Sequence, residues 1–234
     1  MFSLYQPLPG NQCSITEQYC LISYGGILIW VNSIWNFRMT DLDTDVLIVG
    51  GGPCGLMLAN ELGQRGIKTA LYCDRAGTSP DPQANATQAR TMEHFRRLGF
   101  VDVIRDNGLP VDYPTDISYF TRYTGYELAR FKLPSSSEAK KIIKTMSGSW
   151  SAAELPHRIS QMYVEQTLKN QAEKHACIEL NFSAPVISVA DHGDHVRAMV
   201  EQKGAQKEVR ARYLVGCDGP RSLVRKSLGI EYTG

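Results

Sequence analysis

The chain has 234 residues, a formal net charge of +1 and 43% hydrophobic residues, which suits one sizeable domain or one and a half. No basic excess, run of like charges or low-complexity tract is present, so neither a nucleic-acid partner nor a disordered tail is expected. The six cysteines form no C-x-x-C or Cys/His zinc pattern, which predicts no metal site and a reduced, cytoplasmic setting.

Residues 1–38 differ from the rest, because Arg38 is the first Lys or Arg of the chain. The stretch 21–35 is apolar, but Ser, Gly and Asn interrupt it, and it is shorter than the ~20 residues of a membrane span. It also lacks the positively charged start of a secretory signal. We expect an unstructured or loosely docked extension over 1–38, with a membrane anchor as the alternative, and a domain over 39–234.

The most informative stretch is 45–55, Asp-Val-Leu-Ile-Val-Gly-Gly-Gly-Pro-Cys-Gly. Its continuous apolar run, 46–49, predicts a buried parallel strand. Gly50, Gly52 and Gly55 then fit G-x-G-x-x-G. In that motif the first glycine permits a tight turn, the second lets the backbone approach a pyrophosphate, and the third lets helix pack on strand.

The residues that follow supply the context that this motif requires. A helix is expected at 56–65 with Gly66 as its stop, so its N-terminus offers unpaired N–H groups to an anion. A second strand is expected at 68–73, and Asp74 at its end is suited to accept hydrogen bonds from both ribose hydroxyls of a dinucleotide. A glycine-rich turn without a ligand is the alternative.

A second junction of strand, glycine and helix lies near the end of the chain. The strand ending at Val215 is expected to return beside the first strand, so that Asp218 and Gly219 open over the same crevice. The alternative is a simple turn in which Asp218 caps the next helix. Cys54, Cys73 and Cys217 also fall at predicted strand ends, where packing is a better explanation than redox chemistry.

The remaining segments alternate between helical and β patterns. All five histidines are expected at the surface, because none pairs with a nucleophile or a metal set. The helix at 161–175 is expected to turn Tyr163, Leu168 and Ala172 inward. We expect helices at 87–98, 101–105, 161–175 and 222–228, a loop at 134–149, a hairpin of 117–123 with 126–133, and strands at 178–180, 185–189, 195–201 and 208–215.

Three elements of this sequence resemble the class A flavoprotein monooxygenases, the single-component aromatic hydroxylases, and most of all their phenol and chlorophenol hydroxylase branch. They are 49–55 together with Asp74 and Arg75, the segment 88–99, and the segment 216–225, which is similar to the family's Asp-Gly motif. The resemblance runs from about residue 41 onward. It implies an α/β, Rossmann-like FAD-binding domain of the glutathione-reductase and p-hydroxybenzoate-hydroxylase type, with an inserted β-rich segment at about 110–155 that begins a substrate domain.

The resemblance also implies a cofactor set and a reaction. FAD is implied as cofactor and NAD(P)H as co-substrate, for hydroxylation of a small aromatic molecule with O₂. The cofactor-binding residues implied are Gly50, Gly52, Gly55, Asp74, Arg75, Gln161, Asp218 and Gly219, while no catalytic residue is assigned.

The family carries a later Gly-Asp motif that this chain does not reach, so we expect a truncated, N-terminal portion. A catalytically inactive FAD-binding remnant or module is one alternative. Another FAD or NAD Rossmann oxidoreductase is the second, although the Asp218–Gly219 segment argues against it.

Overall fold

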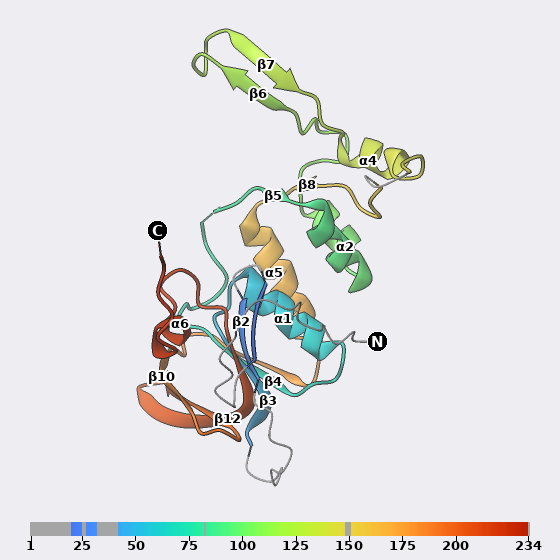
Figure 1. Ribbon diagram of the computed structural model, residues 1–234. Coiled ribbons are helices and arrows are strands. Elements are labelled where there is room, and N and C mark those ends of the chain that lie inside the picture. The colour runs from blue at the N-terminus through green and yellow to red at the C-terminus, as the bar shows by residue number, and fades with distance from the viewer. Residues whose placement is uncertain (1–19, 25–26, 32–41, 82, 148–150, 234) are drawn as a thin grey trace, which may run out of the picture.

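The computed structural model describes residues 20–24, 27–31, 42–81, 83–147 and 151–233. Four parallel strands form the centre of the molecule, in the order β12-β3-β4-β9 (Figure 1). The predicted return of the last strand beside the first is confirmed, with Val215 of β12 opposite Ile48 of β3. The bounds of these strands are Thr44–Val49 for β3, Thr69–Tyr72 for β4, Ile178–Asn181 for β9 and Ala205–Gly216 for β12.

Apolar residues on both faces explain why β3 contains a continuous apolar run. Ile48 of β3 packs in a cluster with Leu56 of α1 (Pro53–Gly63) and Leu168 of α5 (Gln161–Ala172). Its neighbour Leu47 points to the opposite face, because side chains alternate along a strand. The sheet is therefore buried between two layers, as a parallel sheet requires.

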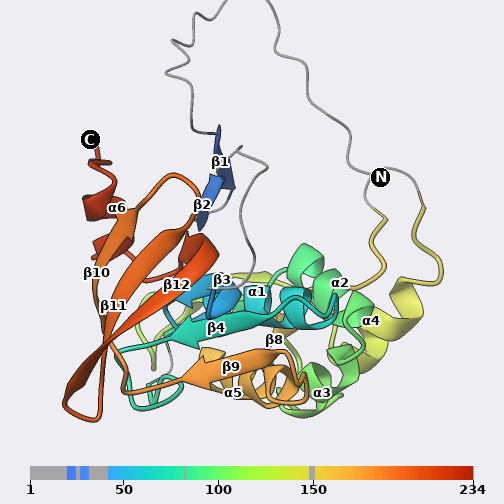
Figure 2. The same ribbon diagram turned by 90° about the horizontal axis from the view of Figure 1, so that it is seen from below.

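The layer on the second face is an antiparallel sheet. It consists of β10 (Val186–Asp191), β11 (Val196–Gln202) and the first part of β12. Figure 2 shows these strands on the left, beside β3, β4 and β9. The long strand β12 belongs to both sheets and thus connects this layer to the strand edge where α6 (Leu223–Ser227) begins.

Two strands lie within the predicted extension. β1 (Cys20–Tyr24) and β2 (Ile27–Val31) form an antiparallel pair, and β2 pairs with β12 at Val215 and Gly216. The rest of the extension lies outside the described residues, and its boundary at residue 38 stays a prediction. No described helix combines the length and the apolar character that a bilayer crossing needs.

An inserted segment connects β4 to α5. Its hairpin, β6 with β7, is confirmed and projects away from the body of the molecule (Figure 1). The expected loop at 134–149 is wrong in part, because α4 forms there behind a capping box of Ser135 and Glu138. The elements are β5 (Ala86–Thr87), α2 (Ala89–Arg97), α3 (Val101–Asp106), β6 (Ile117–Phe120), β7 (Glu127–Phe131), α4 (Ser136–Ile142) and β8 (His157–Arg158).

Two side-chain predictions need correction. Tyr163 is 52% exposed, although we expected it to face inward. His157 is buried instead of at the surface, because the pairing of β8 with β5 brings it beside Gly108 and Arg105. Such a pairing joins segments some seventy residues apart, and periodicity in the sequence does not report it.

Candidate functional site

Two glycine turns meet where β3 and β12 end. Val49 and Gly216 are partners in the parallel ladder, so both strands deliver their next residues to the same edge of the sheet. The N–H of Cys217 donates to the carbonyl of Val49 at 2.7 Å, and that of Gly50 donates to the carbonyl of Tyr72 at 2.8 Å. The carboxyl ends of adjacent parallel strands are where open α/β sheets bind ligands.

The three glycines of the first turn have different tasks. Gly50 has φ +111°, a conformation that side chains disfavour, and a Cβ there would collide with the backbone of Cys217. A Cβ at Gly55 would collide with the carbonyl of Gly50. A Cβ at Gly52 would meet only Nη2 of Arg75, at an ordinary 3.8 Å. Packing therefore demands glycine at 50 and 55, whereas at 52 it leaves open space over the cleft.

Helix α1 begins at this cleft with its positive end uncompensated. Its N-cap is Gly52, which provides no side-chain hydrogen bond, and Pro53 occupies the first helical position. The first turn contains no acidic residue. Free N–H groups and the helix dipole together make such an end a ready site for an anion.

Asp74 and Arg75 follow β4 and border the same cleft. Nη2 of Arg75 donates to the carbonyl of Gly51 at 3.0 Å, and its Nη1 lies 3.5 Å from Oε2 of Glu165. Gln161, the first residue of α5, donates from Nε2 to Oε1 of Glu165 at 2.8 Å. The sequence reasoning missed Glu165, although its spacing of four residues from Gln161 on one helix was a usable signal.

Asp218 and Gly219 form the second turn. Oδ2 of Asp218 accepts from the N–H groups of Leu223 and Val224 at 2.6 and 3.2 Å, so the aspartate supports the start of α6. Its Oδ1 is buried without a hydrogen-bond partner among the described protein atoms. Gly219 has φ +72°. The N-cap of α6 is Ser222, and Asp218 supports that cap through Oδ2, which leaves its Oδ1 for a ligand hydroxyl or amide.

Three cysteines, Cys54, Cys73 and Cys217, border the cleft. Burial above all raises the pKa of the Cys217 thiol to about 12, and the nearby Cys54 and Asp218 add to the rise. Cys217 is therefore protonated at neutral pH and is a poor nucleophile. Among the described residues no group of three or more His, Cys, Asp or Glu is placed to hold a metal ion.

The cleft brings together seven of the eight predicted cofactor residues. The eighth, Gly55, lies beneath the turn in α1. The cleft has a volume of about 560 Å³, which falls within the range of small-molecule sites. The uncapped helix end, the open space at Gly52 and the unpartnered oxygen of Asp218 fit a dinucleotide with its diphosphate and sugar hydroxyls. The cleft is bordered by Gly50, Gly52, Asp74, Arg75, Gln161, Asp218 and Gly219, with Gln83, Pro185 and Arg221 among its other residues.

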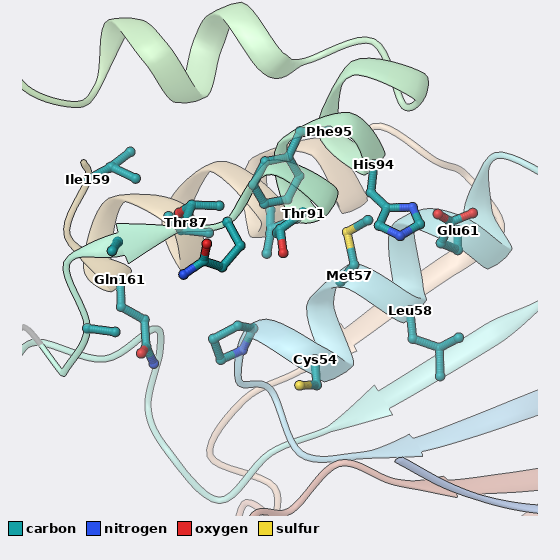
Figure 3. A pocket seen from close by; sticks show the side chains of 16 residues that line it. Cys54, Met57, Leu58, Glu61, Thr87, Thr91, His94, Phe95, Ile159 and Gln161 are labelled. Carbon is teal, nitrogen blue, oxygen red and sulfur yellow. The ribbon is translucent and has the colours of Figure 1, made fainter. Parts of the chain in front are cut away.

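A second, mostly apolar cavity of about 540 Å³ adjoins the first. Figure 3 shows Met57 and Leu58 of α1 on one side of it, with Thr91 and Phe95 of α2 opposite. Cys54 and Gln161 border both cavities. The two spaces therefore meet where α1 and α5 begin, the first bordered by glycines and charged side chains, the second mostly apolar.

Fold and cleft together define a dinucleotide-binding domain with the glycine turn at the switch between β3 and β12. The family model described as "FAD binding domain" matches residues 43–234, and the chain belongs to that family. This confirms the fold class, the relation to class A flavoprotein monooxygenases and FAD as the cofactor.

Individual relatives agree with this assignment. The chain is 31% identical over 192 residues to the "FAD-dependent monooxygenase apdD" of Emericella nidulans. The aligned region covers 81% of this chain and 31% of the relative. It is 35% identical to "Aklavinone 12-hydroxylase DnrF" of Streptomyces peucetius, over 84% of this chain and 40% of that one. The chain thus spans about a third of the length of these curated relatives.

Solved structures show the same similarity in three dimensions. RebC, a rebeccamycin biosynthetic enzyme solved with reduced flavin, has a TM-score of 0.70 at 34% identity, over 81% of this chain and 35% of RebC. The flavin-dependent monooxygenase PieE, solved with FAD and substrate, has a TM-score of 0.73 at 27% identity, over 83% of this chain and 33% of PieE.

Proposed function

We propose that this chain is the FAD-binding portion of a monooxygenase that uses NAD(P)H and O₂ to hydroxylate a small aromatic molecule. The observation that carries the proposal is the meeting of two glycine turns, at Gly50–Gly52 and Asp218–Gly219, at the ends of two adjacent parallel strands. The first turn alone is common to many dinucleotide enzymes. The second turn beside it is what favours this class over other FAD or NAD oxidoreductases.

The proposed roles of the residues follow from the geometry of the cleft. The diphosphate would lie over Gly52 at the start of α1, where N–H groups and the helix dipole favour negative charge. Asp74 would accept from the ribose hydroxyls of the adenosine half. Gln161 and the unpartnered Oδ1 of Asp218 would contact the other half of the cofactor.

In such enzymes the bound flavin supplies the redox and oxygen chemistry, while the protein binds, orients and excludes water. We assign no proton-transfer residue within this chain. Its contribution is a rigid socket, since Gly50 and Gly55 fix the turn and Asp218 fixes the start of α6. Rigid placement matters because small displacements of a reacting group reduce the rate strongly.

An aromatic substrate is proposed from the names of the relatives and from the apolar cavity. One relative is named for aklavinone, and another, from Burkholderia, is a 4-methyl-5-nitrocatechol 5-monooxygenase at 31% identity. The cavity between α1 and α2 has apolar walls that suit a flat ring system. A cytoplasmic location is proposed from the scattered cysteines, of which Cys54, Cys73, Cys177 and Cys217 are free.

The test begins with the purified chain. We expect it to bind FAD, and we expect a yellow protein from cells that supply the cofactor. Addition of phenols should then stimulate NAD(P)H oxidation if this chain suffices for turnover. A yellow protein without stimulation favours an FAD-binding module that needs further polypeptide. A colourless protein that takes up no added FAD contradicts the proposal.

A further inference from the structure

One carboxylate beside the cleft is fully buried. Glu165, in the second turn of α5, has 0% of its surface exposed. Placing a carboxylate in the interior is unfavourable unless hydrogen bonds and an opposite charge compensate for the loss of water. A hydrophobic residue would fill this inward position of the helix at no such cost. The hydrogen-bond and ion-pair partners of Glu165 therefore indicate the role of its buried carboxylate.

Those partners all come from segments that border the cleft. Oε2 accepts from the backbone N–H of Ser79 at 2.8 Å, and Oε1 accepts from Nε2 of Gln161 at 2.8 Å. The only oppositely charged partner in the described structure is Arg75, whose Nη1 lies 3.5 Å from Oε2. Glu165 thus ties the segment after β4 to the first turn of α5.

Arg75 extends this connection to the glycine turn. Its Nη2 donates to the carbonyl of Gly51 and faces the open position at Gly52, while its side chain stays 36% exposed. A free arginine would lose considerable rotamer entropy when a ligand fixed it. Held between Glu165 and Gly51, the guanidinium is already oriented, and a planar guanidinium suits phosphate oxygens.

We propose that Glu165 is a positioning residue for the cofactor, whose buried carboxylate holds the Arg75 guanidinium beside the glycine turn where the diphosphate binds. The inference rests on the proposed function and adds a residue to it. Its physical content is preorganisation: the free protein has already ordered the cation before the dinucleotide arrives.

The test compares four proteins: the wild type, Glu165→Gln, Arg75→Gln and the double variant. Glutamine at 165 keeps the shape, still accepts from Ser79 through its oxygen, and donates to Gln161 once that amide flips. The attraction for Arg75 is lost, and the flip of Gln161 does not affect the ADP measurement, because Gln161 is assigned to the other half of the cofactor. Dissociation constants are measured by calorimetry for FAD, for ADP, which retains the diphosphate, and for adenosine, which has none.

We expect Glu165→Gln to weaken FAD and ADP by about tenfold, as the loss of one charge-assisted contact would, and to leave adenosine unchanged. In the Arg75→Gln background, the same change should add less than twofold, because residues that act through each other are not additive. Glu154→Gln is the matched control. It removes the charge from another buried Arg–Glu pair, with Arg105 at 2.6 Å, far along the chain from the glycine turn.

The control should lower thermal stability while FAD affinity stays at the wild-type value. If Glu165→Gln behaves like Glu154→Gln, losing stability but not FAD or ADP affinity, Glu165 is only structural and the inference is overturned. Full additivity with Arg75→Gln also overturns it. A wild-type protein that binds no FAD would instead refute the proposed function itself, so the two failures are distinguishable.

Discussion

At the scale of single residues, Gly52 is a position where the fold tolerates a side chain but the proposed diphosphate does not. Its Cβ would contact only Arg75 Nη2 at 3.8 Å and would point into the cleft. We therefore predict that Gly52→Val leaves the fold largely intact and abolishes measurable FAD binding, because the side chain occupies the space of the diphosphate. Flavin fluorescence titration and the thermal midpoint of the apoprotein measure the two effects.

Gly55→Ala is the control for this prediction. A Cβ there collides with the Gly50 carbonyl, so this smaller substitution should lower the thermal midpoint of the apoprotein. Unchanged flavin occupancy in Gly52→Val would contradict the assignment of the cleft.

His157 makes stability depend on pH. Burial and the neighbouring Arg105 lower its pKa from 6.5 to about 4. The unfolded chain therefore binds a proton between these values that the folded protein does not, and stability is lost as the pH falls through 6.5 towards 4. We predict a loss of about 2 kcal/mol between pH 7.5 and 5, from the shift in pKa.

Urea unfolding at both pH values measures this loss, with His157→Gln as the comparison. The variant should show a flatter dependence over the same interval. If wild type and variant lose equal stability, His157 is not the group responsible.

The sequence predicts the position of a residue best where backbone geometry imposes the residue type. Gly50 and Asp218 lie at the expected strand ends, because a tight turn and a strand end leave recognisable patterns, while their contact with a cofactor stays a prediction. Glu165 and His157 were missed because their environments arise from contacts between distant segments, which a single sequence does not encode in its periodicity.

At the scale of elements, α4 depends on its N-terminal capping box. Ser135 Oγ accepts from the N–H of Glu138 at 3.3 Å, and Oε2 of Glu138 accepts from the N–H of Ser135 at 2.9 Å. We predict that Ser135→Ala destabilises this helix by about 1 kcal/mol. Hydrogen exchange over residues 136–142 should then accelerate roughly fivefold, while that of α1 stays unchanged. Equal protection in both proteins would show that packing, not the cap, determines α4.

The elements found from sequence are the ones with a clear apolar pattern. The continuous run at 46–49 is buried, and so are Met92 and Phe95 on the inward side of α2, as expected. The capping box of α4 was missed, because the polar character of 134–149 favoured a loop. Two-residue strands such as β5 and β8 have no local signature, because only their pairing defines them.

At the scale of the whole molecule, the β6–β7 hairpin projects away from the body (Figure 1). Tyr123 is 100% exposed and Tyr126 is 85% exposed, and no described residue of the hairpin belongs to either core cluster. We predict that replacing residues 117–131 by a short Gly/Ser linker leaves FAD affinity within twofold and the thermal midpoint unchanged. A marked loss of affinity would show that the insert contributes to the cofactor site.

The part of the sheet topology that follows from the order of strands and glycine turns along the chain was predictable. A strand ending in a second glycine turn was expected to return beside the first strand, and it does so in register. The antiparallel sheet of β10 to β12 was predicted as strands but not as the cover of the second face. That role depends on the bend of β12 between two sheets, a property of the packed molecule.

A crystal structure of this chain with FAD or, more simply, with ADP would test the assignment of the cleft. We predict the diphosphate over Gly52 at the start of α1, the ribose hydroxyls within hydrogen-bond distance of Asp74, and Arg75 beside the phosphates. A nucleotide bound elsewhere, or a saturating concentration that leaves this cleft empty, would contradict it.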